Sequence, residues 1–155
     1  MGNKRTLSVV FVILSIVTFI ACLLLNFVEF QQGGISASIR SVIITFWYAT
    51  VWILVLVTGI KGRNRGAVKY CSIFWFITFI TSITGLYVNM ADTVVEGVVS
   101  WLFVPMLLFL GQWYGLRFFM HVYNDITYLS LIAVISLVML AIAVIWLKRN
   151  KNKSE

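Results

Sequence analysis

The chain has little of the chemistry on which most soluble enzymes and metalloproteins depend. Its 155 residues include one histidine, two cysteines, one proline and five acidic residues. These counts exclude a zinc site built from several Cys and His ligands, and they exclude a disulfide framework. Only 11% of the residues are charged, against about a quarter in a soluble domain. An ordinary soluble globule is therefore excluded as well.

Long apolar runs dominate what is present. Hydrophobic residues make up 61% of the chain, and the mean hydropathy is +1.00. A helix needs about 20 apolar residues to cross a bilayer, and long continuous runs indicate helices rather than barrel strands. The sequence therefore predicts an all-α, polytopic integral membrane bundle with five transmembrane helices in a single transmembrane domain, 1–155. The expected helices cover about 7–28, 41–60, 70–88, 98–116 and 126–147, followed by a basic tail, 148–155.

The distribution of Lys and Arg bears on how many segments cross. Positive residues favour the cytoplasmic side, so Lys4 and Arg5 predict a cytoplasmic N-terminus in a multi-pass cell-membrane protein. With five spans, the cytoplasmic and outer sides would carry seven and five positive residues. With a fourth segment that re-enters and returns, the numbers become ten and two. Five spans are the main prediction, and four spans plus a re-entrant fourth segment are the alternative.

The composition of the fourth segment leaves both alternatives open. Residues 98–110 are almost entirely apolar, which favours a complete crossing. Pro105 can kink a helix, and Gly111, Gln112 and Gly115 follow it closely. The net charge of +7 lies mostly in the 61–69 loop and the tail. Basic groups there attract anionic lipid, so the expected partner is the bilayer and not nucleic acid.

Small and polar residues recur at helical spacing along three segments. Residues at that spacing share one face, and small residues with Ser or Thr mediate helix packing in membranes. These faces are predicted to point into the bundle, and the alternative is a polar path for a substrate. The faces comprise Ser15, Thr18, Cys22, Asn26 and Glu29 in the first segment, Ser41, Thr45, Tyr48, Trp52, Val55 and Gly59 in the second, and Cys71, Trp75, Thr78, Ser82, Gly85 and Asn89 in the third.

Two further details concern packing. Gly111 and Gly115 form a small-xxx-small match, which could seat a partner helix or a homodimer contact. Cys22 lies deep in the first segment, whereas Cys71 opens the third at the cytoplasmic face. A disulfide needs Cα atoms within about 7 Å, so the two cysteines are expected to be unpaired packing residues.

Arg117, His121 and Asp125 are spaced four residues apart, with Tyr114 one turn earlier. On a continuous helix they would form one polar face. Arginine could hold an anionic headgroup and histidine could move a proton. The alternative is a solvated interfacial loop, since neighbouring aromatic residues suit the membrane boundary.

Glu29, Asp92 and Glu96 are all expected on the outer side. Asp92 and Glu96 lie four residues apart and, with Asn89, could offer oxygen ligands to a divalent cation. The alternative is that acidic residues lie outside because the basic residues stay inside. So few ligands predict no metal site, and no cofactor is expected.

Three functional hypotheses follow. The leading one is a non-enzymatic accessory, regulatory or immunity-type subunit that packs on a membrane partner or on itself as a homo-oligomer. It rests on the absence of catalytic motifs such as G-x-S-x-G beside abundant packing faces. The second is a small oligomeric transporter or channel, which an even number of spans would favour. The third is a lipid-acting membrane enzyme that uses His121.

Overall fold

The computed structural model describes residues 2–31, 38–91, 96–119 and 125–151, and these residues are almost entirely helical. This confirms the predicted all-α class. The elements in chain order are α1 (Gly2–Gln31), α2 (Ile39–Lys61), α3 (Arg65–Met90), α4 (Glu96–Leu110), the 3₁₀ helix η1 (Gly111–Phe119) and α5 (Asp125–Lys151).

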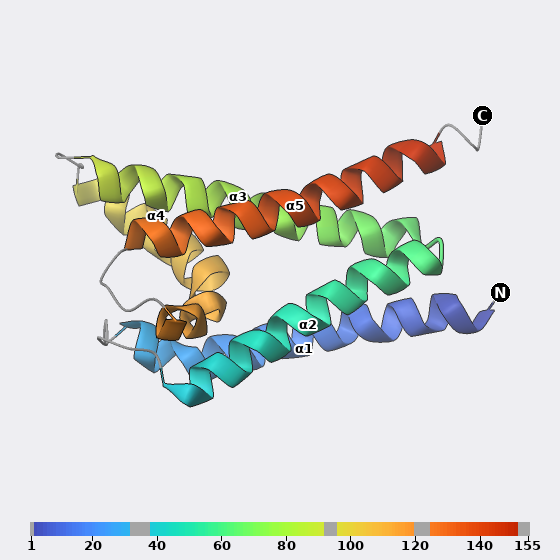
Figure 1. Ribbon diagram of the computed structural model, residues 1–155, viewed down its shortest axis with the longest axis horizontal. Coiled ribbons are helices and arrows are strands. Elements are labelled where there is room, and N and C mark those ends of the chain that lie inside the picture. The colour runs from blue at the N-terminus through green and yellow to red at the C-terminus, as the bar shows by residue number, and fades with distance from the viewer. Residues whose placement is uncertain (1, 32–37, 92–95, 120–124, 152–155) are drawn as a thin grey trace.

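Four helices, α1, α2, α3 and α5, are long and apolar enough to cross a membrane. They alternate in direction, so that the first turn of α1, the α2–α3 connection and the last turn of α5 lie together (Figure 1). We call this the terminal end. The opposite end, with the last turn of α1 and the first turns of α2 and α5, is the distal end. The protein is thus a small multi-pass membrane protein.

The fourth segment corrects the prediction of five spans. At 1.5 Å per residue, the 15 residues of α4 reach about 22 Å, less than the hydrocarbon thickness of about 30 Å. Helix α4 starts at the distal end and runs into the bundle, and η1 turns back toward the same end (Figure 1). The ring of Phe109 lies 5.7 Å from that of Phe74, whereas Gly115 lies against Ser41 in the first turn of α2. The chain therefore follows the alternative, a re-entrant fourth segment.

This path explains the distribution of charge. Nine of the eleven lysines and arginines in the described residues lie at the terminal end, and only Arg40 and Arg117 lie toward the distal end. All three described acidic residues, Glu29, Glu96 and Asp125, lie at the distal end. The basic residues at the end of α5 and those of the α2–α3 connection therefore lie at the same end of the bundle, as expected if both face the cytoplasm. The nine positive residues are Lys4, Arg5, Lys61, Arg63, Arg65, Lys69, Lys148, Arg149 and Lys151.

The helices pack in two pairs, α1 with α2 and α3 with α5, with α4 and η1 between the pairs in the distal half (Figure 1). The predicted inward faces are confirmed, because their members are buried except for exposed Asn89 and for Glu29, whose side chain is not described. A Cβ atom on Gly85 would lie 3.1 Å from Met106 and 3.3 Å from Leu129. Cys22 and Cys71 are both buried and unpaired, as expected.

Candidate functional site: the re-entrant hairpin

The turn between α4 and η1 lies inside the bundle, where its backbone carbonyls need hydrogen-bond donors. In a membrane interior, an unsatisfied backbone group costs several kcal/mol. Side chains from three other helices supply these donors. The Tyr128 hydroxyl donates to the Leu110 carbonyl at 2.8 Å, and the Asn26 amide donates to the Gly111 carbonyl at 3.5 Å. The Thr45 hydroxyl donates to the Gln112 carbonyl at 2.8 Å.

Thr45 and Gly115 together hold η1 against α2. The Thr45 hydroxyl also accepts a hydrogen bond from the Gly115 N–H at 3.1 Å. A Cβ atom on Gly115 would lie 2.2 Å from the Ser41 carbonyl oxygen and 2.6 Å from the Thr45 hydroxyl. Only glycine fits this contact. Gly115 thus seats η1 on a helix of its own chain, whereas the sequence predicted that Gly111 and Gly115 would seat a partner helix or a homodimer contact.

An aromatic cluster, which includes Trp113 of the hairpin, fills the middle of the bundle. Trp113 bridges two helices, because its ring lies 5.6 Å from that of Tyr48 and 5.7 Å from that of Trp75. Trp52 stacks on Phe74 with ring centroids 3.7 Å apart. Aromatic pairs of this kind add stability beyond their buried area. The cluster therefore joins α2, α3 and η1 through ring contacts.

The most unusual side chain of the hairpin is Gln112. It is fully buried, and neither its amide nitrogen nor its amide oxygen has a hydrogen-bond partner within the described residues. The Oδ1 atom of Asn26 and the indole nitrogen of Trp113, both buried, also lack partners there. Each unpaired buried polar group costs about 1–3 kcal/mol. The hairpin therefore carries donors and acceptors that its own packing does not use.

The predicted polar cluster is assembled in part. Arg117 forms a salt bridge with Asp125, which joins the end of η1 to the start of α5. Its guanidinium also lies 5.6 Å from the Tyr114 ring centroid and 5.2 Å from that of Tyr128, within the range of a cation–π contact. His121 lies outside the described residues. Arg117 is thus engaged in closing the hairpin, and a role for His121 stays a prediction.

The role of the predicted acidic residues stays a prediction. Glu29 and Glu96 lie at distal helix ends, and Asp92 lies outside the described residues. No three His, Cys, Asp or Glu residues in the described segments come together as metal ligands. Thr78 and Ser82, which were candidates for packing or a polar path, donate to the carbonyls of Phe74 and Thr78 in their own helix. Their role in packing or in a polar path stays a prediction.

Sequence reasoning missed the central role of Asn26, Thr45 and Gln112. The first two belong to faces that were predicted to be buried, but nothing local indicates that they meet the fourth segment. One signal in the sequence could have found them. Asn26 and Gln112 are uncharged amides within apolar runs, and polar side chains at membrane depth form hydrogen bonds with other helices. No family model, no curated protein and no solved structure matches this chain.

Proposed function

We propose that this protein is a small membrane transport protein whose substrate site is the buried polar group around Gln112. The observation that carries the proposal is the fully buried amide at the inner turn of a re-entrant hairpin, whose two polar atoms have no hydrogen-bond partner in the part of the chain that the structure describes. Irregular backbone at membrane depth is tolerated where it is buried in protein or lines a cavity. A passing solute would supply the hydrogen bonds that Gln112 lacks.

The surroundings of Gln112 define the class of solute. The side chains that bond or stack around the inner turn are amides, hydroxyls and aromatic rings, and none carries a charge. The guanidinium of Arg117, which lies against the Tyr128 ring, is paired with Asp125. A charged solute would therefore have to be buried without a free countercharge, which is expensive. The proposed substrate is therefore a small neutral molecule with hydrogen-bonding groups.

The aromatic cluster favours a carrier over an open pore. Stacked Trp52 and Phe74, with Trp113 against Trp75, fill the middle of the bundle. A solute can pass only if these rings separate, as in carriers that open to one side at a time. Discontinuous helices around a midplane site are a recurring arrangement in such proteins.

The other two hypotheses lose part of their basis. The accessory-subunit prediction rested on packing faces, and those faces are occupied within the chain. A partner would need a different surface. The enzyme prediction paired His121 with Arg117, but Arg117 is bound to Asp125. Both remain predictions.

The test is whether water reaches position 112 during the working cycle. In a chain with Cys22→Ala and Cys71→Ala, the substitution Gln112→Cys should react with a small water-soluble methanethiosulfonate in reconstituted liposomes. Leu137→Cys is the matched control, since that half-exposed apolar position of α5 faces lipid. We expect labelling at 112 and none at 137.

A second measurement links access to transport. Liposomes with the unmodified protein should swell faster than empty liposomes in a gradient of at least one small neutral polyol or amide. The substitution Gln112→Leu should remove most of that difference. Absence of both labelling at 112 and protein-dependent swelling would refute the proposal.

A further inference from the structure

The helices group into two bodies, and the boundary between them passes through the hairpin. Helix η1 packs mainly on α1 and α2, whereas α4 packs mainly on α3, which pairs with α5 (Figure 1). The hydrogen bonds of the turn change sides at the same point. The Leu110 carbonyl accepts from Tyr128 of α5, but the next carbonyl, that of Gly111, accepts from Asn26 of α1. We call α1, α2 and η1 the first body, and α3, α4 and α5 the second body.

Gln112 lies at this boundary. Its carbonyl accepts a hydrogen bond from Thr45 of the first body. The ring of the next residue, Trp113, contacts Tyr48 of the first body and Trp75 of the second. The buried amide of Gln112 therefore lies next to the surface along which the two bodies meet, and a movement of one body against the other would change access to it.

A charged contact joins the two bodies at the distal end. Arg117 of η1 forms a salt bridge with Asp125 at the start of α5. The Arg117 guanidinium also lies 5.2 Å from the ring centroid of Tyr128, again in α5, within the range of a cation–π contact. The Asp125 side chain is 50% exposed and that of Arg117 is 28% exposed. Because water reaches this contact, it can open at modest cost.

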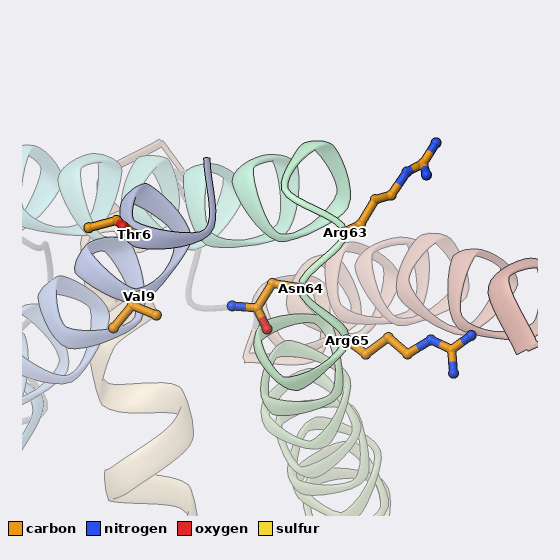
Figure 2. Close-up of a pocket in the computed structure, with 5 residues that line it drawn as sticks. All are labelled: Thr6, Val9, Arg63, Asn64 and Arg65. Atoms are coloured by element: carbon orange, nitrogen blue, oxygen red, sulfur yellow. The ribbon is translucent and has the colours of Figure 1, made fainter. Parts of the chain in front are cut away.

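Uncharged contacts join the two bodies toward the terminal end. The Asn64 side chain, at the start of α3, donates to the buried Ser8 hydroxyl of α1 at 3.2 Å. Figure 2 shows Asn64 directed toward α1. Deeper in the bundle, the hydroxyls of Ser15 in α1 and Tyr70 in α3 lie 3.3 Å apart, within hydrogen-bond distance. These contacts are also weak enough to open, since a single hydrogen bond between neutral groups contributes little net stability.

A pocket of about 670 Å³ lies beside the contact of α1 with Asn64. It is lined by Thr6 and Val9 of α1 and by Arg63, Asn64 and Arg65 of the α2–α3 connection (Figure 2). The guanidinium groups of both arginines are directed away from α1, so the uncharged Asn64 faces that helix. Pockets that hold small molecules measure about 300–1,000 Å³. The pocket therefore offers room for a small neutral solute at the terminal end of the boundary.

A buried polar face of α1 connects the level of this pocket with the level of Gln112. Ser8, Ser15 and Thr18 are at most 4% exposed, and the same face continues to Asn26. The Oδ1 atom of Asn26 has no hydrogen-bond partner among the described residues. A neutral solute that moves along this face would find hydroxyl and amide groups at each step.

We infer that the substrate path runs between the two bodies, with the Arg117–Asp125 contact as its distal gate and the Ser8–Asn64 contact as its terminal gate. This inference rests on the proposed function, because it takes Gln112 as the substrate site. With the distal gate open and the terminal gate closed, a solute reaches Gln112 from the distal side. The reverse arrangement lets the solute leave through the terminal pocket.

The test measures access to position 112 from each side of the membrane. In the chain with Cys22→Ala, Cys71→Ala and Gln112→Cys, an impermeant methanethiosulfonate is applied to oriented vesicles from the distal or the terminal side. Arg117→Gln should raise the distal labelling rate by about threefold and lower the terminal rate, because losing the distal contact favours the state that is open there. Ser8→Ala should have the reverse effect, also by about threefold, since one hydrogen bond is lost.

Matched variants separate the two gates from general loosening of the bundle. Arg40→Gln removes an exposed charge at the distal end, and Ser72→Ala removes a hydroxyl that donates to the Val68 carbonyl of its own helix. Both should leave the two labelling rates unchanged. Arg117→Lys, which keeps the positive charge, should restore most of the original distal rate.

The outcomes distinguish this inference from the proposed function. Faster labelling from both sides in a gate variant would indicate loosening and would overturn the gates. Labelling of position 112 at rates that neither Arg117→Gln nor Ser8→Ala changes would also overturn them, and the transport proposal would stand. Absence of labelling at 112 in every one of these chains would refute the transport proposal and the path with it.

Discussion

The fourth segment and α5 are both rich in apolar residues, yet α5 crosses the bundle and the fourth segment turns back. Helix α5 contains neither Pro nor Gly in its 27 residues, so no residue in its interior interrupts the backbone hydrogen bonding of an α-helix. The fourth segment contains Pro105, Gly111 and Gly115, and it ends its α-helix at Leu110. The difference shows that apolarity brings a segment into the membrane, whereas unbroken backbone hydrogen bonding carries it across.

The comparison also shows what a turn inside the membrane requires. Helix α5 packs along α3 and needs little from other helices to satisfy its backbone. The carbonyls of the hairpin accept hydrogen bonds from the side chains of Asn26, Thr45 and Tyr128. The hairpin also needs a glycine at position 115 to approach α2. The following substitutions test these dependencies, from the largest expected effect to the smallest.

The first prediction concerns which side of the membrane each position faces, and its outcome is all or none. In a chain without Cys22 and Cys71, single cysteines at exposed Phe119 and Arg40 should react with an impermeant maleimide from one side. Cysteines at exposed Arg63 and Arg149 should react only from the other. Labelling of position 119 together with position 63 would mean that the fourth segment crosses, and the comparison would fail.

The second prediction concerns Gly115. Ala at this position would place Cβ 2.2 Å from the Ser41 carbonyl oxygen, so η1 must move away from α2. We expect a loss of about 3 kcal/mol, at the upper end for overpacking, seen as a lower thermal unfolding midpoint in detergent. Gly66→Ala is the control, since the nearest atom to its Cβ would be Asn64 Oδ1 at 3.4 Å. Equal stability of the two variants would contradict the described seat of η1.

The third prediction concerns Thr45. Thr45→Val keeps the shape but removes the hydroxyl that serves the Gln112 carbonyl and the Gly115 N–H. Two buried backbone groups lose their partner, so we expect a loss of about 2 kcal/mol. The matched control is Thr50→Val in the same helix, because exposed Thr50 donates only to the Phe46 carbonyl. Chemical unfolding in mixed micelles should separate the two, and a neutral Thr45→Val would argue against this contact.

The fourth prediction concerns Tyr128, where the effect should be smallest. Tyr128→Phe removes the hydroxyl that donates to the Leu110 carbonyl at 2.8 Å, for an expected cost of about 1 kcal/mol. Tyr87→Phe, at a position that is 72% exposed, should be neutral. Amide hydrogen exchange should also increase locally at residues 110–115 in Tyr128→Phe, and unchanged exchange there would count against the bond.

Much of the fold could be read from the sequence, and the central site could not. Continuous apolar runs placed all five segments, and the inward faces of α1, α2 and α3 followed from helical spacing. The pairing of Arg117 with Asp125 lay within one predicted cluster. The contacts of Thr45 with Gln112 and of Asn26 with Gly111 join residues 67 and 85 positions apart. Such contacts depend on where the fourth segment turns, and spacing within one helix carries no information about that.

The donors of the hairpin also bear on the order in which the protein is assembled during synthesis. Asn26 and Thr45 belong to α1 and α2, which leave the ribosome before the fourth segment. When residues 111–115 enter the membrane, partners for two carbonyls and one N–H are already in place. The Leu110 carbonyl, by contrast, must wait for Tyr128 in α5. Proteins fold from the N-terminus as they are made, so α1 and α2 act as a template for the hairpin, and α5 completes it.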